Sequence, residues 1–118
     1  MDFRIIDDTL QYYNLMLADI AQAKSHIFLE TFKFANDHLG VRFRDALTRK
    51  AREGIKVKVL IDSWGKGPVS ETFFEELISY GGEVRFFEKI KINTDLFTRG
   101  HRRDHRKIVV IDDMITYI

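Results

Sequence analysis

The strongest constraint on the fold is the alternating run 55–62 (IKVKVLID), which a helix-patterned segment and Gly54 precede. Apolar residues occupy every second position of this run, as in a strand with one buried face. Another strand is expected over residues 25–34 (SHIFLETFKF), which are rich in aromatic and β-branched side chains. Strand, helix and strand in this order predict a βαβ unit with two parallel strands. The chain is therefore expected to be an α/β protein.

The rest of the chain continues this pattern. Helices are predicted over residues 9–24 and 70–80, and short strands over residues 83–87 and 114–118. Residues 108–111 (IVVI) show no polar alternation, which predicts a strand buried on both faces. We expect a mixed, mostly parallel β-sheet with helices packed on both faces. The basic residues of the middle helix, Lys50 included, are expected to face solvent.

Composition narrows the class of protein. A chain of 118 residues is one domain at most, and its formal net charge of +1 argues against general nucleic-acid affinity. The absence of cysteine excludes disulfide bonds and thiolate chemistry. No apolar run is long enough to span a membrane, and the first residues do not resemble a signal peptide. Positive charge is concentrated in residues 99–107, where it can steer an anionic ligand.

Two residues of this basic segment form a candidate reactive pair. His105 and Lys107 stand two positions apart at the entrance of the 108–111 strand, so both are expected on one side of it. An ammonium neutralises a phosphate oxygen, while an imidazole attacks phosphorus or transfers a proton. His101 lies in the same basic loop and is expected at most to touch a substrate phosphate.

Glu30 and Asp112 are the carboxylates that this pattern singles out. Glu30 shares a strand face with Phe28 and Phe32, where a carboxylate is costly unless it is paired. It is either a structural ion pair or an acceptor that orients a catalytic group. Asp112 lies an odd number of residues after His105 and so faces the opposite side of a straight strand. A structural or orienting role suits it better than direct chemistry.

His105-x-Lys107-x-x-x-x-Asp112 resembles the HxKxxxxD signature of the phospholipase D superfamily, and its flanking residues are most similar to the first such motif of bacterial cardiolipin synthases. The resemblance implies a phospholipase D-like fold and a catalytic motif of His105, Lys107 and Asp112. It implies a phosphohistidine intermediate, with His105 as the expected nucleophile. Arg103 is expected to bind substrate or to support the residues that do, and Trp64 to line a substrate pocket or cap the core. Neither a metal nor a cofactor is expected.

The resemblance also implies a wider context. Residues 1–118 would be the first catalytic half of a two-motif enzyme, truncated at the C-terminal end and inactive as a monomer. The second HxKxxxxD half would come from the same native chain or from a dimer. The implied substrate is a phospholipid such as phosphatidylglycerol. The implied location is the cytoplasmic side of the bacterial inner membrane, peripheral or tethered by a segment absent here.

Two alternative functions remain open from the sequence. A single-motif, metal-independent endonuclease that dimerises would suit the basic run 99–107, but near-zero net charge and the lack of a following Asn-containing turn disfavour it. A catalytically silent domain could instead use the same basic pocket to bind anionic lipid or a protein partner. Nucleic acid is therefore the less favoured ligand.

Overall fold

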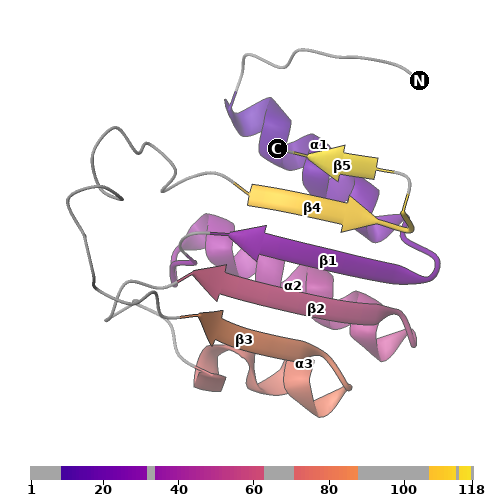
Figure 1. The fold of residues 1–118 in the computed structure, drawn as a ribbon. Coiled ribbons are helices and arrows are strands. Elements are labelled where there is room, and N and C mark those ends of the chain that lie inside the picture. Colours follow the sequence, from indigo (N-terminus) through magenta and orange to yellow (C-terminus); the bar gives the residue numbers. More distant parts are fainter. Residues whose placement is uncertain (1–8, 32–33, 63–70, 88–106, 114, 118) are drawn as a thin grey trace.

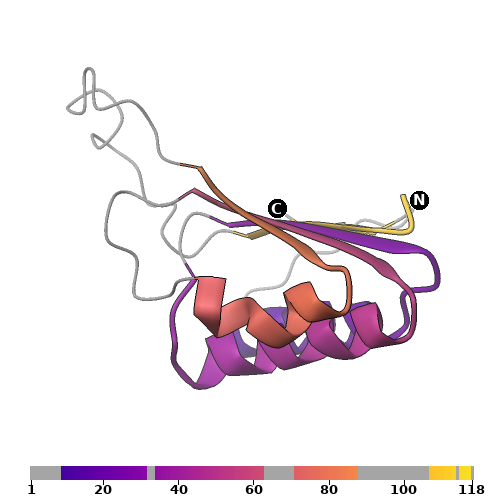
Figure 2. The same cartoon turned by 90° about the horizontal axis from the view of Figure 1, so that it is seen from below.

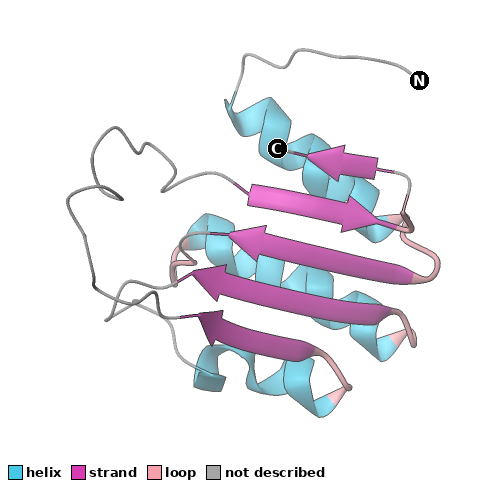
Figure 3. Cartoon of the chain, in the orientation of Figure 1, coloured by secondary structure: helices cyan, strands magenta, loops and turns pink. Residues whose placement is uncertain are grey.

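The computed structural model describes residues 9–31, 34–62, 71–87, 107–113 and 115–117. Helices and strands alternate along most of this part of the chain (Figures 1 and 3). In chain order the elements are α1 (Thr9–Ala21), β1 (His26–Thr31), α2 (His38–Arg52), β2 (Lys56–Asp62), a 3₁₀ turn η1 (Glu71–Phe74), α3 (Glu75–Ser79), β3 (Glu83–Phe87), β4 (Lys107–Ile111) and β5 (Ile115–Tyr117). The α/β pattern predicted from the sequence is confirmed.

The five strands form one mixed sheet in the order β3-β2-β1-β4-β5. β1 pairs with β2, and β2 with β3, in parallel, so both predicted βαβ units are present. β4 is antiparallel to β1 and to β5, and the other four strands all point the same way (Figure 1). The predicted mostly parallel sheet is therefore confirmed.

The three described α-helices, α1, α2 and α3, all lie on one face of this sheet (Figure 2). The expectation of helices on both faces is thus wrong for the described part of the chain. Right-handed crossovers explain this arrangement, because β1, β2 and β3 follow one another in a single direction across the sheet and so place α2 and α3 on the same side.

The single helical layer also corrects the prediction for β4. Val109 and Ile111 face the helices and are buried, whereas Ile108 and Val110 are half-buried on the helix-free face. The expectation that this strand is buried on both faces was therefore wrong. A run of four branched apolar residues does not by itself distinguish a strand covered on two faces from one covered on one.

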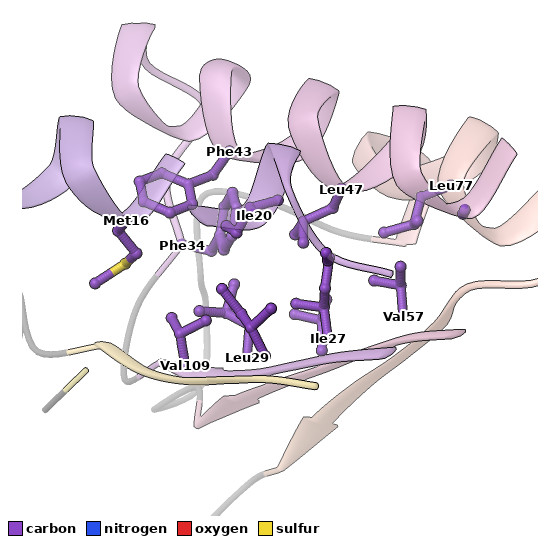
Figure 4. Packing of buried hydrophobic residues seen from close by; sticks show 14 of the residues in the cluster. Met16, Ile20, Ile27, Leu29, Phe34, Phe43, Leu47, Val57, Leu77 and Val109 are labelled. Carbon is purple, nitrogen blue, oxygen red and sulfur yellow. The ribbon is translucent and has the colours of Figure 1, made fainter. Parts of the chain in front are cut away.

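The hydrophobic core lies between the sheet and the helices (Figure 4). Strand residues Ile27, Leu29 and Val59 meet helix residues Phe43 and Leu47, and all five are buried. The inward positions predicted for β2 are confirmed, since Val57, Val59 and Ile61 are each only 2% exposed. At the strand ends the core becomes aromatic: Phe34 and Phe74 pack edge to face with ring centroids 5.1 Å apart.

Local sequence signals account for the helix ends. The Asp37 side chain accepts a hydrogen bond from the Gly40 N–H at 2.8 Å and caps the start of α2. Gly54 and Gly81 follow α2 and α3 with φ of 93° and 97°, conformations that a side chain would oppose.

Lys50 does not face solvent as predicted. Its side chain is 6% exposed, and its Nζ donates to the Ala21 carbonyl at 3.1 Å and pairs with Glu53 at 2.9 Å. The ammonium thus lies at the C-terminal end of α1, where unpaired carbonyl groups attract a cation. Helical periodicity could not reveal this contact, because it depends on how two helices pack.

No helix in the described ranges combines the length and the apolar character that a bilayer crossing requires.

Candidate active site

Four strands have one end at the same edge of the sheet. β1, β2 and β3 end there at Thr31, Asp62 and Phe87, and β4 begins there at Lys107 (Figure 1). Thr31 pairs with Lys107 on one side and with Ile61 on the other. Lys107 of the HxKxxxxD motif therefore starts its strand at the carboxyl edge of the parallel strands, where α/β proteins usually place their ligands.

Four of the predicted site residues fall outside the described residues. They are His105, His101, Arg103 and Trp64. Their roles stay predictions. The structure places the backbone of Lys107 and the side chains of Glu30 and Asp112. Glu30 and Lys107 occupy neighbouring register positions on β1 and β4, whereas Asp112 lies at the other end of β4.

Glu30 lies close to this edge but on the helix-free face. Its register partners are Leu60 on β2 and Ile108 on β4, both half-buried apolar residues. Lys107 occupies the alternate register position of β4, which it shares with Val109 and Ile111. The structure records no ion pair or hydrogen bond for the Glu30 carboxylate within the described ranges. The role of Glu30 as an orienting acceptor stays a prediction.

Asp112 lies at the opposite end of β4 from Lys107, beside the turn that joins α1 to β1. Its carboxylate accepts hydrogen bonds from the backbone N–H groups of Lys24 at 2.9 Å, Ser25 at 2.8 Å and His26 at 3.0 Å. The Ser25 hydroxyl donates a fourth at 2.9 Å. In return the Asp112 N–H donates to the His26 carbonyl at 3.0 Å. We call these contacts the Asp112 clasp.

The clasp keeps Asp112 ionised. The backbone N–H groups of His26, Lys24 and Ser25 hold the pKa of the Asp112 carboxyl well below its usual range, because they bond only to the charged form. Both oxygens of the carboxylate accept hydrogen bonds, so Asp112 holds the backbone of residues 24–26 in place at this end of the sheet. Asp112 and its neighbour Asp113 both have positive φ, 52° and 62°, as the tight turn before β5 requires.

Ser25 and His26 are the residues that the sequence did not single out. The His26 ring lies between the Ser25 hydroxyl and the Asp113 carboxylate, 3.1 Å from each. The Ser25 hydroxyl has one proton, and Asp112, which only accepts, is 2.9 Å away. Ser25 is thus a structural donor, and this Ser-His-Asp arrangement lacks a free hydroxyl nucleophile. No motif links residues 25 and 112, so only the fold reveals their contact.

Comparison with known protein families identifies the class of protein to which this chain belongs. Residues 16–118 match the family described as "Cardiolipin synthase, PLD-like domain". This match covers most of the chain and includes the whole HxKxxxxD motif. The chain belongs to this family of phospholipase D-like domains, and the resemblance seen in the sequence is confirmed.

Three relatives that this chain resembles are named as cardiolipin synthases. The major cardiolipin synthase ClsA of Bacillus subtilis is 40% identical over 114 residues, which are 97% of this chain and 23% of that protein. Cardiolipin synthase B of Salmonella typhimurium is 37% identical over 115 residues, 98% of this chain and 28% of the relative. Cardiolipin synthase 1 of Staphylococcus aureus is 42% identical over 106 residues, 90% and 21% of the two chains. The chain thus spans about a quarter of the length of these relatives.

Proposed function

We propose that this chain is the first catalytic half of a cardiolipin synthase-like phosphatidyltransferase. The observation that carries the proposal is the family match over residues 16–118, which includes the motif whose lysine begins β4 at the carboxyl edge of the sheet. The names of the relatives support a phospholipid as substrate, and we propose phosphatidylglycerol.

The proposed reaction exchanges one alcohol for another on a phosphodiester. The imidazole of His105 attacks phosphorus of the first phosphatidylglycerol, and the bond to its glycerol headgroup breaks. A histidine of the second motif protonates the departing glycerol oxygen and then takes the proton from a hydroxyl of a second phosphatidylglycerol. That hydroxyl displaces His105 from phosphorus, which leaves cardiolipin and free histidine. The two histidines can exchange these roles.

Lys107 and Asp112 have different tasks in this proposal. The ammonium of Lys107 would neutralise non-bridging phosphate oxygens as charge builds in the transition state. Asp112 would not touch the reacting atoms, because its carboxylate already accepts four hydrogen bonds at the other end of β4. Cationic side chains would supply the charge neutralisation that Mg²⁺ provides in many phosphoryl-transfer enzymes, so the reaction should need no metal.

A reconstitution experiment tests the proposal. The chain is supplied with a second HxKxxxxD half, in cis or in trans, and labelled phosphatidylglycerol in vesicles is followed to cardiolipin with EDTA present. We expect turnover from the pair, none from the isolated monomer, and a loss of about a thousandfold or more for His105→Ala. A phosphohistidine trapped at His105 would support the covalent step. Arg49→Ala, on the exposed side of α2, serves as the matched control.

The other outcomes distinguish the alternatives. DNA cleavage by a dimer of this chain without lipid turnover would replace the proposal by a nuclease function. Binding of anionic vesicles without turnover, even with the second half present, would indicate a silent binding domain. Association with vesicles also tests the proposed location at the membrane surface.

A further inference from the structure

The sequence of β4 leaves its own register undetermined. Register is normally specified by alternation, because a slip of one residue carries every side chain to the other face. Residues 108–111 are Ile-Val-Val-Ile, so a slip would exchange one pair of branched apolar side chains for another at the core. The hydrophobic effect alone therefore discriminates weakly between the observed register and its neighbours.

No tight turn sets this register either. β1 ends at Thr31 and β4 begins at Lys107, so the two paired strands are far apart in the chain. The turn at Asp112 and Asp113 aligns β4 with β5 but does not align β4 with β1, because among the described strands β5 pairs only with β4. The register of β4 against β1 must come from another contact.

The Asp112 clasp has the required specificity. Three consecutive backbone N–H groups, those of Lys24, Ser25 and His26, converge on one carboxylate at the start of β1. A slip of one residue would move that carboxylate along the strand by about 3.3 Å, which exceeds the tolerance of a hydrogen bond. All of these bonds would then be lost together, and the backbone N–H groups would be left without this partner.

We propose that the Asp112 clasp is a register lock for β4, with Ser25 as a positioning residue. Asp112 holds one end of the strand, and this sets the register position of Lys107 at the other end, opposite Thr31. The consequence for catalysis rests on the proposed function: a slip would carry Lys107, and the His105 expected beside it, to the other face. The lock itself is a statement about strand pairing and is tested without activity.

Cysteine cross-linking measures the register directly, because the chain contains no cysteine of its own. Glu30→Cys with Ile108→Cys reports the observed register, in which these residues are partners on the helix-free face. Val109→Cys combined with Glu30→Cys reports a slip in one direction, and combined with Phe28→Cys a slip in the other. In the observed register Val109 faces the opposite side from both, so a short dithiol-bridging reagent should not join them.

Each pair is introduced into the full chain alone and together with Asp112→Ala or Ser25→Ala. With Asp112→Ala we expect the slipped products to rise on the order of tenfold, since charge-assisted hydrogen bonds are lost. Ser25→Ala removes one of the four contacts and should give a smaller rise. Ser25→Thr, which keeps the hydroxyl, should restore the observed register. Ser79→Ala is the control, because the Ser79 hydroxyl donates within its own helix, to the Glu76 carbonyl, far from β4 in the chain.

A folded Asp112→Ala chain that yields only the Glu30–Ile108 product would overturn the lock. Should Asp112→Ala fail to fold, Ser25→Ala decides, and an unchanged product pattern there also overturns it. Missing lipid turnover by the unmodified chain, with the second half supplied, would count against the proposed function and leave the lock standing.

Discussion

Lys50 donates from its Nζ to the carbonyl oxygen of Ala21 at 3.1 Å, and so joins the C-terminal ends of α2 and α1. The same ammonium pairs with Glu53. Because α1 and α2 both cover the sheet from one side, this contact fixes one helix of that layer against the other (Figure 2).

Replacing Lys50 should destabilise the fold. Lys50→Met keeps the aliphatic stem but leaves the Ala21 carbonyl without its donor, and we expect the free energy of unfolding to fall by about 2 kcal/mol. Urea denaturation measures this change. Arg49→Met, at the exposed neighbouring position, should shift the value by less than about 0.5 kcal/mol. Equal stability of the two variants would show that the Lys50 contact contributes nothing.

Asp112 should make the free energy of unfolding depend on pH in the acidic range. Its pKa is lowered in the folded chain, so its contribution is fully present above the unfolded value of about 3.9 and is lost as the pH falls toward the folded value. Asp112→Asn should therefore lower the urea midpoint at pH 7 and at pH 5, and the gap to the unmodified chain should narrow below about pH 4. Asp45→Asn, an exposed carboxylate on α2, is the matched control. A gap that stays constant down to pH 2.5 would contradict the role of the clasp.

Gly40 should not tolerate a side chain. A Cβ at this position would collide with the backbone carbonyl oxygen of Ala35 in the turn between β1 and α2. We expect Gly40→Ala to cost about 3 kcal/mol of unfolding free energy. Gly54→Ala provides the comparison: its φ of 93° opposes a side chain, but no atom lies within 4 Å of the added Cβ. That variant should lose only about 1 kcal/mol, and a larger loss than for Gly40→Ala would refute the steric argument.

Replacing Glu30 should change stability and activity in opposite directions. Glu30→Leu places an apolar side chain between half-buried Leu60 and Ile108, and we expect a gain of about 1 kcal/mol in unfolding free energy. If Glu30 orients a catalytic group, the same variant will lose turnover in the reconstituted enzyme, as functional residues often reduce stability. Glu83→Leu, on an exposed position of β3, should change neither quantity appreciably. Full activity of Glu30→Leu would exclude the orienting role.

Much of the fold could be predicted because it depends on short-range patterns. The alternation in β2, the helical spacing in α2 and the glycine at position 54 each act over a few residues, and the predicted strand and helix form there. The HxKxxxxD spacing likewise predicted the family, since it is a local signature on a strand. The odd spacing between His105 and Asp112 already suggested that the carboxylate is kept away from the chemistry.

The remaining features depend on which surfaces meet. The sequence predicted Lys50 to be one more solvent-facing cation of α2. In the structure the C-terminal end of α1 packs against its ammonium group. β4 is buried on a single face because the helices pack on that side of the sheet. The four apolar residues of β4 do not encode which side this is.

The sequence by itself therefore determined the α/β class, the order of the elements and the family, because periodicity, capping and motif spacing are properties of neighbouring residues. Only the tertiary structure decided what Asp112 does. Its hydroxyl partner, Ser25, is 87 residues away, and the two meet because β4 inserts antiparallel beside β1. Strand pairing brings distant backbone N–H groups to one carboxylate, and no local pattern in the chain specifies that meeting.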